Sequence, residues 1–596
     1  MRRPLWIPWR WWRRAAQLLL LLVFLWLFRR TEYTGADQLA GGENIFFRLD
    51  PLAGAAAMLA ARQFIALFWP ALALVALTLI LGRFFCGWVC PLGTLLDYFH
   101  RLLRPLAKRT NRLLESRISN SRRLGGADIP VCPGGRHFEG RQECLPHRGE
   151  KCRLTAAGRA AKYFLLIAVL TAAAFAFPLV GLVDPFSLLV RGLTFWIDPM
   201  LFRGVDACFG WAGEGWAADV LQPFVKKRLL PFRPMVFHLA GLSAAILAVV
   251  FALELAARRF WCRYVCPLGA GLGLLARWSL VKRLPAKVCK SCGDCVAACR
   301  MGALDPAAGF SPEACNLCME CVDFCPKGIA RFTIEIGRKV VSPQCHPERS
   351  EGSGANSAEI LRSAQDDRRQ ARPVRLSRRT VLTGIAAGAA MPGIAWAARL
   401  GQQRPVPPDL LRPPGAADEP TFLGLCIRCG ECMKVCPTNV LQPAIFQSGV
   451  EGLFSPRLIP RLIFEQSYCE YACTLCGQVC PTGAIPRLDE EAKHAQPTGK
   501  AYFDHNLCLP WAEKTACIRC EEMCPAPDKA IKILNTRKII GKDGQEVEIQ
   551  QPYVDRDLCV GCGICESNCT IEGTAGIRVF RVDAADPQTE FLLKPK

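Results

Sequence analysis

Six groups of four cysteines constrain this chain more than any other feature of its sequence. Four groups have the spacing C-x2-C-x2-C-x3-C, one opens with a three-residue gap, and one opens with an eight-residue gap. Together they use 24 of the 33 cysteines. Thiolates at this spacing hold [4Fe–4S] clusters, and the fourth cysteine of each run usually binds the neighbouring cluster. We therefore predict six clusters with these iron ligands: Cys289, Cys292, Cys295 and Cys299; Cys315, Cys318, Cys321 and Cys325; Cys426, Cys429, Cys432 and Cys436; Cys469, Cys473, Cys476 and Cys480; Cys508, Cys517, Cys520 and Cys524; Cys559, Cys562, Cys565 and Cys569.

Other cysteine chemistries fit this pattern poorly. A disulfide framework is typical of small secreted domains, whereas this chain has 596 residues and is 51% hydrophobic. Structural zinc sites pair two C-x2-C units across a longer gap. Proline follows Cys325, Cys436, Cys480 and Cys524, and the bacterial ferredoxin run also ends in C-P. So many one-electron centres in one chain indicate electron transport.

Charge is distributed unevenly along the chain. Residues 401–596 hold 21 Lys or Arg and 25 Asp or Glu, so the remaining residues carry a net charge of +26. The basic residues border apolar segments rather than forming the basic face of a folded domain, which a nucleic-acid-binding protein would be expected to have. We therefore predict a membrane protein that binds no nucleic acid.

Five apolar stretches are predicted to cross the membrane, since a span needs about 20 mostly apolar residues. They are 15–28, 64–82, 161–183, 236–256 and 380–398. The basic N-terminus and the loop 101–160, with 14 Lys or Arg against 5 Asp or Glu, should be cytoplasmic by the positive-inside rule. The expected location is the bacterial inner membrane, crossed several times, in contact with lipid and the quinone pool.

Two of these stretches end in the same motif, R-F-[FW]-C-x-x-V-C-P-L-G. Its cysteines are Cys86 and Cys90 in the first copy and Cys262 and Cys266 in the second. The repeat indicates duplicated halves that bring four thiols to one membrane depth. Three interpretations remain open: a redox-active thiol or metal site, a cluster site, and structural cysteines. We treat the four thiols as the candidate catalytic residues.

Isolated polar residues near the spans are weaker candidates. His238 lies inside a span, where a histidine is a functional candidate by default. Glu254 and Asp184 lie near membrane boundaries and are candidates for accepting a quinol proton, although boundary acids are more often solvated. Cys132, Cys144 and Cys152 fit no cluster spacing.

A polar stretch at 343–373 separates the two halves and predicts a disordered linker. It ends in Ser377-Arg378-Arg379-Thr380-Val381-Leu382, which resembles a twin-arginine export signal. The alternative is a basic flank before a fifth span, and both interpretations put 401–596 outside the cytoplasm. The predicted domains are a four-span membrane domain (1–280), a cytoplasmic two-cluster ferredoxin domain (281–340), a linker (341–374), the twin-arginine-like segment (375–400) and a periplasmic four-cluster domain (401–596).

The fold class expected from these segments is an α-helical polytopic membrane domain joined to α+β ferredoxin-like domains of the bacterial 2[4Fe–4S] type. The repeated C-x3-C-P motif and the cysteine groups after it make residues 1–335 resemble NapH-type membrane ferredoxins, in a wider group with NosR and CcoG types. Residues 375–596 resemble NapG-type ferredoxins, through CIRCGECMKVCPTNV, CEYACTLCGQVCPTGAI, CLPWAEKTACIRCEEMCP and CVGCGICESNC. The two halves are fused here.

The resemblance implies a quinol-dehydrogenase-like component, with quinol as electron donor and a periplasmic reductase or cytochrome as partner. The alternative is a maturation or regulatory factor whose thiols reduce or deliver a metal such as copper. The cytoplasmic pair is expected to hold one cluster by Cys289, Cys292, Cys295 and Cys325, and the other by Cys315, Cys318, Cys321 and Cys299. In 401–596, pairing of the first group with the second, or of the first with the fourth, both remain open.

Overall fold

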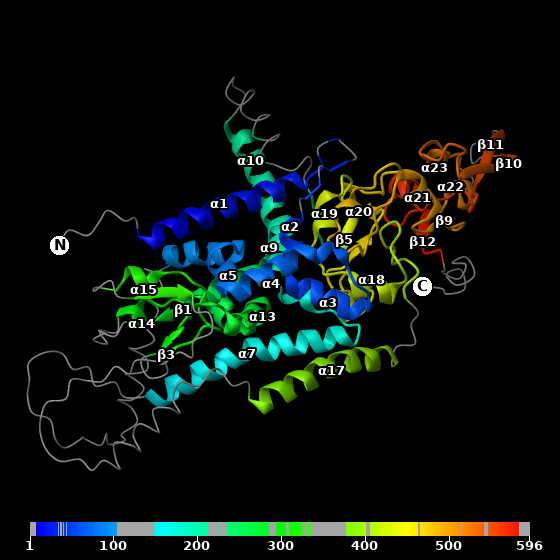
Figure 1. Ribbon diagram of the computed structural model, residues 1–596. Coiled ribbons are helices and arrows are strands. Elements are labelled where there is room, and N and C mark those ends of the chain that lie inside the picture. Colours follow the sequence, from blue (N-terminus) through cyan, green and yellow to red (C-terminus); the bar gives the residue numbers. More distant parts are fainter. Residues whose placement is uncertain are drawn as a thin grey trace, which may run out of the picture. The chain divides into compact units, whose positions relative to one another are not determined.

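The structure is a computed structural model (Figure 1). Its described residues, apart from residue 225 and some positions between 35 and 42, are 8–33, 44–103, 148–212, 235–284, 294–305, 309–325, 330–334, 377–400, 406–462, 465–513, 515–540 and 546–582. Several predicted features lie outside them. These are the linker 343–373 and the cysteines Cys132, Cys144, Cys289 and Cys292.

The chain forms two compact units, each built from three separate stretches. Unit 1 comprises Met1–Leu21, Ala76–Leu166 and Ala248–Thr383, and unit 2 comprises Leu22–Val75, Ile167–Leu247 and Gly384–Lys596. Every boundary between the units falls inside a helix. Five helices therefore contribute residues to both units: α1 (Trp9–Arg30), α4 (Trp69–Leu81), α7 (Arg148–Ala174), α12 (Ala240–Ala252) and α17 (Arg378–Leu400).

Unit 1 adds short helices and strands to its shares of these five helices. The helices are α5 (Phe84–Trp88), a helical stretch over 91–103, η3 (Leu253–Leu255), η4 (Trp261–Val265), α13 (Pro267–Leu275), η5 (Ala276–Trp278), α14 (Asp294–Ala298) and α15 (Glu320–Asp323). The strands are β1 (Val281–Leu284), β2 (Leu304–Asp305), β3 (Gly309–Phe310) and β4 (Arg331–Ile334). Antiparallel pairing of β1 with β4 and of β2 with β3 gives two small sheets.

Unit 2 contains more helices, most of them short. They are α2 (Ile45–Arg48), α3 (Pro51–Ala61), η1 (Ala66–Phe68), α8 (Val180–Val183), α9 (Pro185–Gly192), η2 (Leu193–Ile197), α10 (Asp198–Ala212), α18 (Glu419–Leu425), α19 (Glu431–Val435), η6 (Val450–Gly452), α20 (Leu475–Val479), α21 (Glu490–Ala495), α22 (Leu509–Ala512), α23 (Arg519–Glu522) and α24 (Ile564–Ser567).

The strands of unit 2 form four two-stranded antiparallel sheets among the described residues. The strands are β5 (Leu441–Pro443), β6 (Pro456–Leu458), β7 (Arg461–Leu462), β8 (Glu465–Gln466), β9 (Lys500–Phe503), β10 (Ile531–Ile540), β11 (Glu546–Val554) and β12 (Ile577–Phe580). The pairs are β5 with β6, β7 with β8, β9 with β12 and β10 with β11. Such small sheets alternating with one-turn helices fit the predicted ferredoxin-like α+β class.

Several helix starts follow one local rule, in which an acceptor side chain precedes a proline. Asp50 accepts hydrogen bonds from the backbone N–H groups of Leu52 and Ala53 at the start of α3, and Asp184 accepts one from Ser187 at the start of α9. Cys266 caps α13 in the same way, with its thiol. Proline occupies the first helical position in each case, where its missing N–H costs nothing. The C-P pair of the repeated motif is therefore also a helix start.

The prediction of a polytopic membrane domain is not supported by helix length. Over the described residues, one helix is long and apolar enough to cross a membrane, namely α1. The predicted spans at 64–82 and 236–256 form shorter apolar helices, Ala66–Leu81 and Ala240–Leu255. The first of these helices ends just before Gly82, which has a positive φ of 87°. The second ends at η3, and a π-helical turn, η4, begins soon after it.

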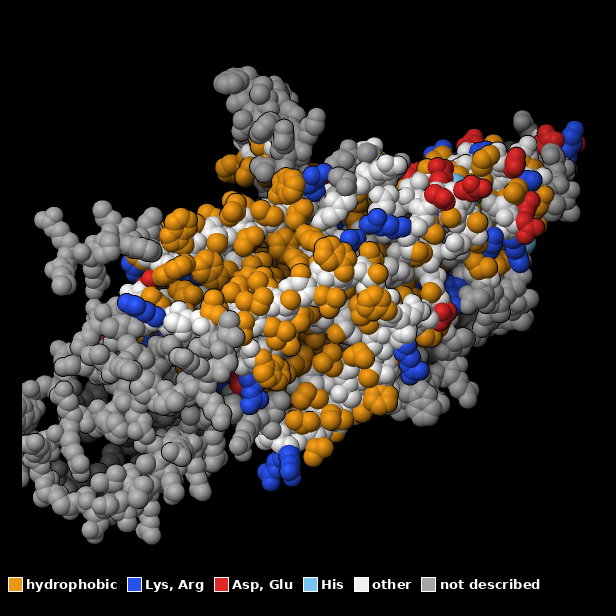
Figure 2. Space-filling view, viewed as in Figure 1, with side chains coloured by type: hydrophobic (Ala, Val, Ile, Leu, Met, Phe, Trp, Pro, Cys, Tyr) orange, Lys and Arg blue, Asp and Glu red, His pale blue; other side chains and the backbone are white. Residues whose placement is uncertain are grey.

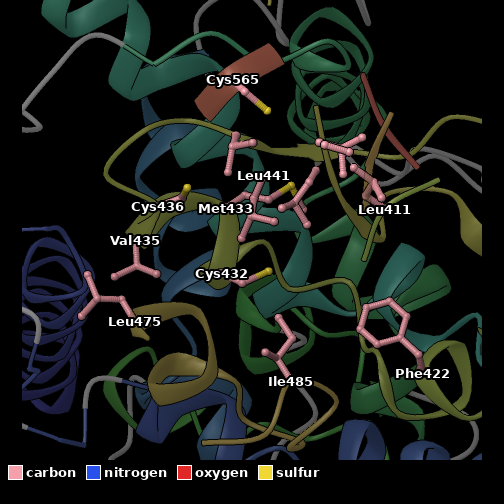
Figure 3. Packing of buried hydrophobic residues seen from close by; sticks show 14 of the residues in the cluster. Leu411, Phe422, Cys432, Met433, Val435, Cys436, Leu441, Leu475, Ile485 and Cys565 are labelled. Atoms are coloured by element: carbon pink, nitrogen blue, oxygen red, sulfur yellow. The ribbon is translucent and has the colours of Figure 1, made fainter. Parts of the chain in front are cut away.

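The core of unit 2 is built around cysteines as much as around aliphatic side chains. Figure 3 shows Cys432 and Cys436 with Met433 and Val435 of α19 between them, and Leu475 of α20 close by. Met433, Val435 and Leu475 are fully buried or nearly so. The cysteine loops therefore form part of the hydrophobic core.

Candidate functional site

The first two cysteine groups of unit 2 exchange their fourth cysteines. The thiols of Cys426, Cys429 and Cys432 each lie near that of Cys480. The thiols of Cys469, Cys473 and Cys476 lie near that of Cys436. We call these sets site A (Cys426, Cys429, Cys432, Cys480) and site B (Cys436, Cys469, Cys473, Cys476). The first group therefore pairs with the second, which the sequence left open.

The third and fourth groups of unit 2 are exchanged in the same way. One hollow is lined by Cys524 together with Cys559, Cys562 and Cys565, and another by Cys569 together with Cys508, Cys517 and Cys520. We call the second set site C (Cys508, Cys517, Cys520, Cys569) and the first set site D (Cys524, Cys559, Cys562, Cys565). Each of the four sites thus gathers four thiols, the number that a [4Fe–4S] cluster requires.

The regular C-x2-C-x2-C loops share a backbone conformation that the irregular loops lack. The residue after the second cysteine is left-handed in three regular loops: Gly430 (φ 89°), Gly563 (φ 77°) and Met319 (φ 58°). The corresponding residues of the two irregular loops are Thr474 and Ile518, which have φ near −122° and −123°. Glycine adopts the left-handed region without strain, so two of the three regular loops place it there. The loops with the three-residue and eight-residue gaps therefore turn without a left-handed residue at this position.

Lys493, a residue of α21, supports the irregular loop of site B. Its ammonium donates hydrogen bonds to the carbonyl oxygens of Glu470, Tyr471 and Cys473, and it also hydrogen-bonds the Cys469 thiol. The lysine is buried, with 6% of its surface exposed. Three charge-assisted bonds to carbonyls within five residues fix the loop in the conformation that gathers the thiols.

Burial of these thiols favours their protonated form. It raises the pKa of Cys508, Cys520 and Cys562 to about 12, because a thiolate loses its hydration in an apolar site. Iron binds the thiolate and releases the proton, so loading of these sites is coupled to proton release. Backbone N–H groups already point at some sulfurs, such as Ala501 N at 3.4 Å from Cys559 Sγ.

The four sites of unit 2 form a continuous row. Site A adjoins α8 and α9, since Arg191 Nη1 donates to the Arg428 carbonyl oxygen at 3.0 Å. Sites B and D adjoin each other through a backbone hydrogen bond of 2.8 Å from Cys469 N to Cys562 O. Helices α23 and α24 pack together and join site C to site D. The order in space is therefore A, B, D, C, which differs from the order in sequence.

Unit 1 gathers a similar set of thiols, which we call site E (Cys299, Cys315, Cys318, Cys321). The Cys315 and Cys321 thiols lie near those of Cys318 and Cys299. Backbone N–H groups of Ala303 and Leu317 donate to the sulfurs of Cys299 and Cys315, at 3.2 and 3.4 Å. The other cysteine set predicted from this part of the sequence has Cys295 and Cys325 among the described residues and its other two cysteines outside them.

The two copies of the repeated motif also meet in unit 1. Cys86, Cys90, Cys262 and Cys266 all lie within electrostatic reach of one another. We call this set the repeat site. Cys86, Cys262 and Cys266 are buried, and Cys90 is partly so. The structure therefore unites the four thiols that the sequence placed at one membrane depth.

The arginine that opens each copy of the motif reaches the other copy. Arg259 donates to the carbonyl oxygens of Cys86 and Gly93, at 2.7 and 3.1 Å, and to Asp97. Arg83 lies over the other turn, since a Cβ added to Gly269 would be 2.8 Å from its Nη2 atom. Both arginines are buried. Both arginines belong to the repeated sequence motif, but the motif alone did not predict that each would contact the other copy.

A buried ion-pair network sits beside the repeat site. Asp97 pairs with Arg259 at 2.7 Å and with Arg300 at 2.6 Å, and these guanidinium groups hold the pKa of its carboxyl well below the usual range. Arg13 of α1 and Arg300 both reach Glu320 of α15. The network ties the N-terminal helix to the turn that carries site E. No sequence pattern pointed to it, because its members lie far apart in the chain.

The isolated polar candidates have mostly structural partners. Asp184 caps α9, and its carboxyl contacts that of Asp50. Glu254 accepts a hydrogen bond from Arg259 N and lies 3.8 Å from His100 Nδ1. His238 is half-exposed and donates its backbone N–H to Gln442. Among these residues, Glu254 is therefore the one closest to the repeat site.

Known proteins resemble this chain over its iron–sulfur regions. A methylamine utilization ferredoxin-type protein MauM from Methylorubrum extorquens is 36% identical over 35% of this chain and 91% of its own length. A MauM from Paracoccus denitrificans is 34% identical over 33% and 82%. The ferredoxin-type protein NapG of Escherichia coli is 35% identical over 29% of this chain and 72% of its own length. The chain belongs to this family of ferredoxin-type proteins. No solved structure matches it.

Two family models locate iron–sulfur regions in this ferredoxin-type protein. A 4Fe-4S dicluster domain matches residues 425–484, the segment that supplies sites A and B. A 4Fe-4S binding domain matches twice, at residues 63–110 and 237–285. The protein therefore contains 4Fe–4S binding domains and functions as an iron–sulfur electron-transfer protein. Each match of the 4Fe-4S binding domain contains one copy of the C-x3-C-P motif.

Proposed function

We propose that this ferredoxin-type protein is a membrane-bound quinol-oxidising relay with six [4Fe–4S] clusters, which delivers electrons to a periplasmic reductase. The observation that carries the proposal is that five mainly apolar helices each belong to both units. Unit 1 holds sites of the cytoplasmic set and unit 2 holds sites A to D. The charge pattern of the sequence, with basic residues that border the apolar segments, supports a membrane location for the chain.

The short helices are compatible with this proposal, although they are below the usual length. Ala66–Leu81 and Ala240–Leu255 would each extend about 24 Å at about 1.5 Å per residue, against a hydrocarbon core of about 30 Å. Local thinning of the bilayer accommodates such a mismatch at modest cost. α1 exposes large apolar side chains suited to lipid, among them Trp12, Leu19 and Trp26. Figure 2 shows that hydrophobic side chains cover much of the face in view.

The six cysteine sets would hold the clusters as proposed from the sequence, with sites A to E gathered as described above. A bound [4Fe–4S] cluster accepts and donates one electron at a time. The protein's own residues shape each site: left-handed residues turn the loops, N–H groups point at sulfur, and buried side chains exclude water. Arg428 is buried next to site A, and its positive charge acts on the Cys426 thiol.

Quinol oxidation also requires acceptors for two protons. Glu254 and His100 are the titratable pair beside the repeat site, 3.8 Å apart. Glu254 is held by the Arg259 backbone, so its carboxyl oxygen is fixed next to the motif. We assign the pair the role of accepting protons from quinol.

The exit is placed at site C, the end of the row that lies farthest along from site A. The loop of site C is exposed to solvent. Ile518 is 37% exposed, and the neighbouring Glu513, Glu522 and Glu572 are also exposed. Acidic side chains gather over α22 and α23 in Figure 2. A periplasmic reductase or cytochrome with a basic face would therefore be steered to this end.

The copper-delivery alternative has less support. A single copper or zinc ion needs thiols within about 4 Å of one another, given metal–sulfur bonds near 2.3 Å. In the described part of the chain, no group of three or more His, Cys, Asp or Glu side chains is arranged to hold such an ion.

The test uses the purified full-length protein in detergent, mixed anaerobically with a quinol analogue. Reduction of the clusters is followed by EPR, with dithionite as the positive control. The proposal expects the quinol analogue to reduce a substantial share of the dithionite-reducible clusters. Oxidised clusters after quinol addition, together with rapid reduction of added copper(II), would favour the maturation factor instead.

A further inference from the structure

We propose that the repeat site (Cys86, Cys90, Cys262, Cys266) holds a seventh iron–sulfur cluster, shared between the two halves of the repeat. The proposal goes beyond the six clusters assigned to the ferredoxin-type groups. It stands whether or not quinol is the electron donor, because it concerns what the four thiols bind.

Each half of the repeat supplies only two possible ligands. The matched segments 63–110 and 237–285 contain Cys86 and Cys90, and Cys262 and Cys266, respectively, and no other cysteine. A [4Fe–4S] cluster takes four thiolates, so neither segment binds one alone. The structure brings both pairs into a single buried set. Two matches to one binding domain therefore describe one site.

The spacing of these thiols suits a cluster better than a single ion or a disulfide. All four are free thiols. Among the described residues, no group of three or more His, Cys, Asp or Glu side chains, these thiols included, is arranged to hold a single metal ion. Site A has the same property, and it lies inside the matched dicluster domain. A cluster of four irons separates its ligand sulfurs more widely than one ion does, so the arrangement of the repeat site, like that of site A, is compatible with a cluster.

Backbone N–H groups point at sulfur in both halves of the repeat site. Gly269 N lies 3.2 Å from Cys266 Sγ, and Gly93 N lies 3.5 Å from Cys90 Sγ. The two glycines occupy the same position of the C-P-L-G motif. At site E, Ala303 N lies 3.2 Å from Cys299 Sγ. N–H donors at this range stabilise sulfur that carries negative charge, as cluster-bound thiolate does.

Buried positive charge surrounds the repeat site. Arg83 lies 3.9 Å from Cys86 Sγ, and Lys162 is buried within electrostatic reach of Cys86 and Cys266. The Glu313 carboxylate lies within electrostatic reach of Lys162 and pairs with Arg277, and the Glu313 backbone carbonyl accepts a hydrogen bond from Arg83. Buried cations are costly unless they are compensated. Four thiolates around a cluster carry net negative charge and provide that compensation.

The repeat site directly adjoins site E. Gly87 lies between Cys86 and Cys90, and a Cβ added to it would be 2.1 Å from the Asn316 carbonyl oxygen, in the loop of site E. The Trp88 indole N–H donates to Leu317 O at 2.9 Å in the same loop. A cluster in the repeat site would therefore be an immediate neighbour of one in site E. This contact explains why position 87, directly after the first cysteine of this copy, is glycine.

The test compares the double variant Cys86→Ser/Cys262→Ser with Cys208→Ser, which removes an exposed free cysteine of α10. Iron and acid-labile sulfide are measured per chain after anaerobic purification. The proposal expects the double variant to lose about four iron and four sulfide, while Cys208→Ser loses none. Unchanged iron and sulfide in a folded double variant would overturn it, and so would loss of copper or zinc instead.

A second variant covers the case in which the double variant does not fold. Lys162→Met keeps all the ligands and removes one buried charge beside the repeat site. Iron content is expected to stay at the wild-type value, while the midpoint potential of one EPR signal falls, because the reduced cluster loses a neighbouring cation. A full set of unshifted potentials would contradict a cluster at this place.

Discussion

Lys493→Met is expected to weaken site B selectively. Methionine has nearly the volume of lysine, so packing is conserved while three carbonyls and one thiol lose their shared donor. Each hydrogen bond to a charged group is worth about 1.5–3 kcal/mol. The carbonyl residues are half-buried and water replaces part of the loss, so we expect a total of about 3–5 kcal/mol. That is a large fraction of a typical stability of about 5–15 kcal/mol.

The assay is urea-induced bleaching of the cluster absorbance, followed anaerobically and at a fixed incubation time. With a slope of about 1–3 kcal/mol per molar urea, the expected loss lowers the midpoint by about 1–5 M for the phase that contains site B. Lys529→Met is the matched control, because Lys529 also donates to two loop carbonyls, those of Glu521 and Glu522, but is less deeply buried. We expect its midpoint to move by less than about 0.5 M.

Equal shifts in the two variants would refute the reasoning, since they would mean that burial of the lysine does not determine its contribution. An unchanged midpoint in Lys493→Met would show that the three-residue gap of site B closes without the lysine.

Three further outcomes follow from the structure. Gly563→Ala is expected to destabilise site D by more than about 1 kcal/mol, because residue 563 has a left-handed φ and the added Cβ would clash with Pro460. Gly573→Ala, which has a similar φ but open space around it, measures the cost of the backbone conformation alone, and thermal bleaching of the clusters compares the two variants. Asp97→Asn should cost about 3–5 kcal/mol, because Arg259 and Arg300 lose their buried partner, and urea unfolding measures this. Burial raises the pKa of Asp198 to about 6, so protonation of its carboxyl favours the folded state. The free energy of unfolding should therefore fall by up to about 3 kcal/mol as pH rises from about 4 to 6. Asp198→Asn should flatten that pH profile, and an unaltered profile would contradict the assignment.

Sequence spacing identified the cysteines that the structure gathers at sites A to E, because the ligand pattern is local. It was not sufficient to pair the groups in 401–596, since both arrangements use the same sixteen cysteines and the choice depends on packing of α19 against α20. Nor did spacing reveal Lys493, Asp97 or Arg300, whose partners are brought close only by folding. Hydropathy overestimated the spans at 64–82 and 236–256, because composition does not register that a positive-φ glycine and a π-helical turn limit their helices.

The membrane relay is tested most directly in proteoliposomes that contain the full-length protein and a lipid-soluble quinol. A membrane-impermeant oxidant is added outside, and its reduction is followed optically. The proposed function predicts quinol-dependent reduction of the external oxidant, and strong slowing in a Cys517→Ser variant that disables site C. Reduction that proceeds equally without the protein or in that variant, or clusters that remain oxidised in the presence of quinol, would contradict it.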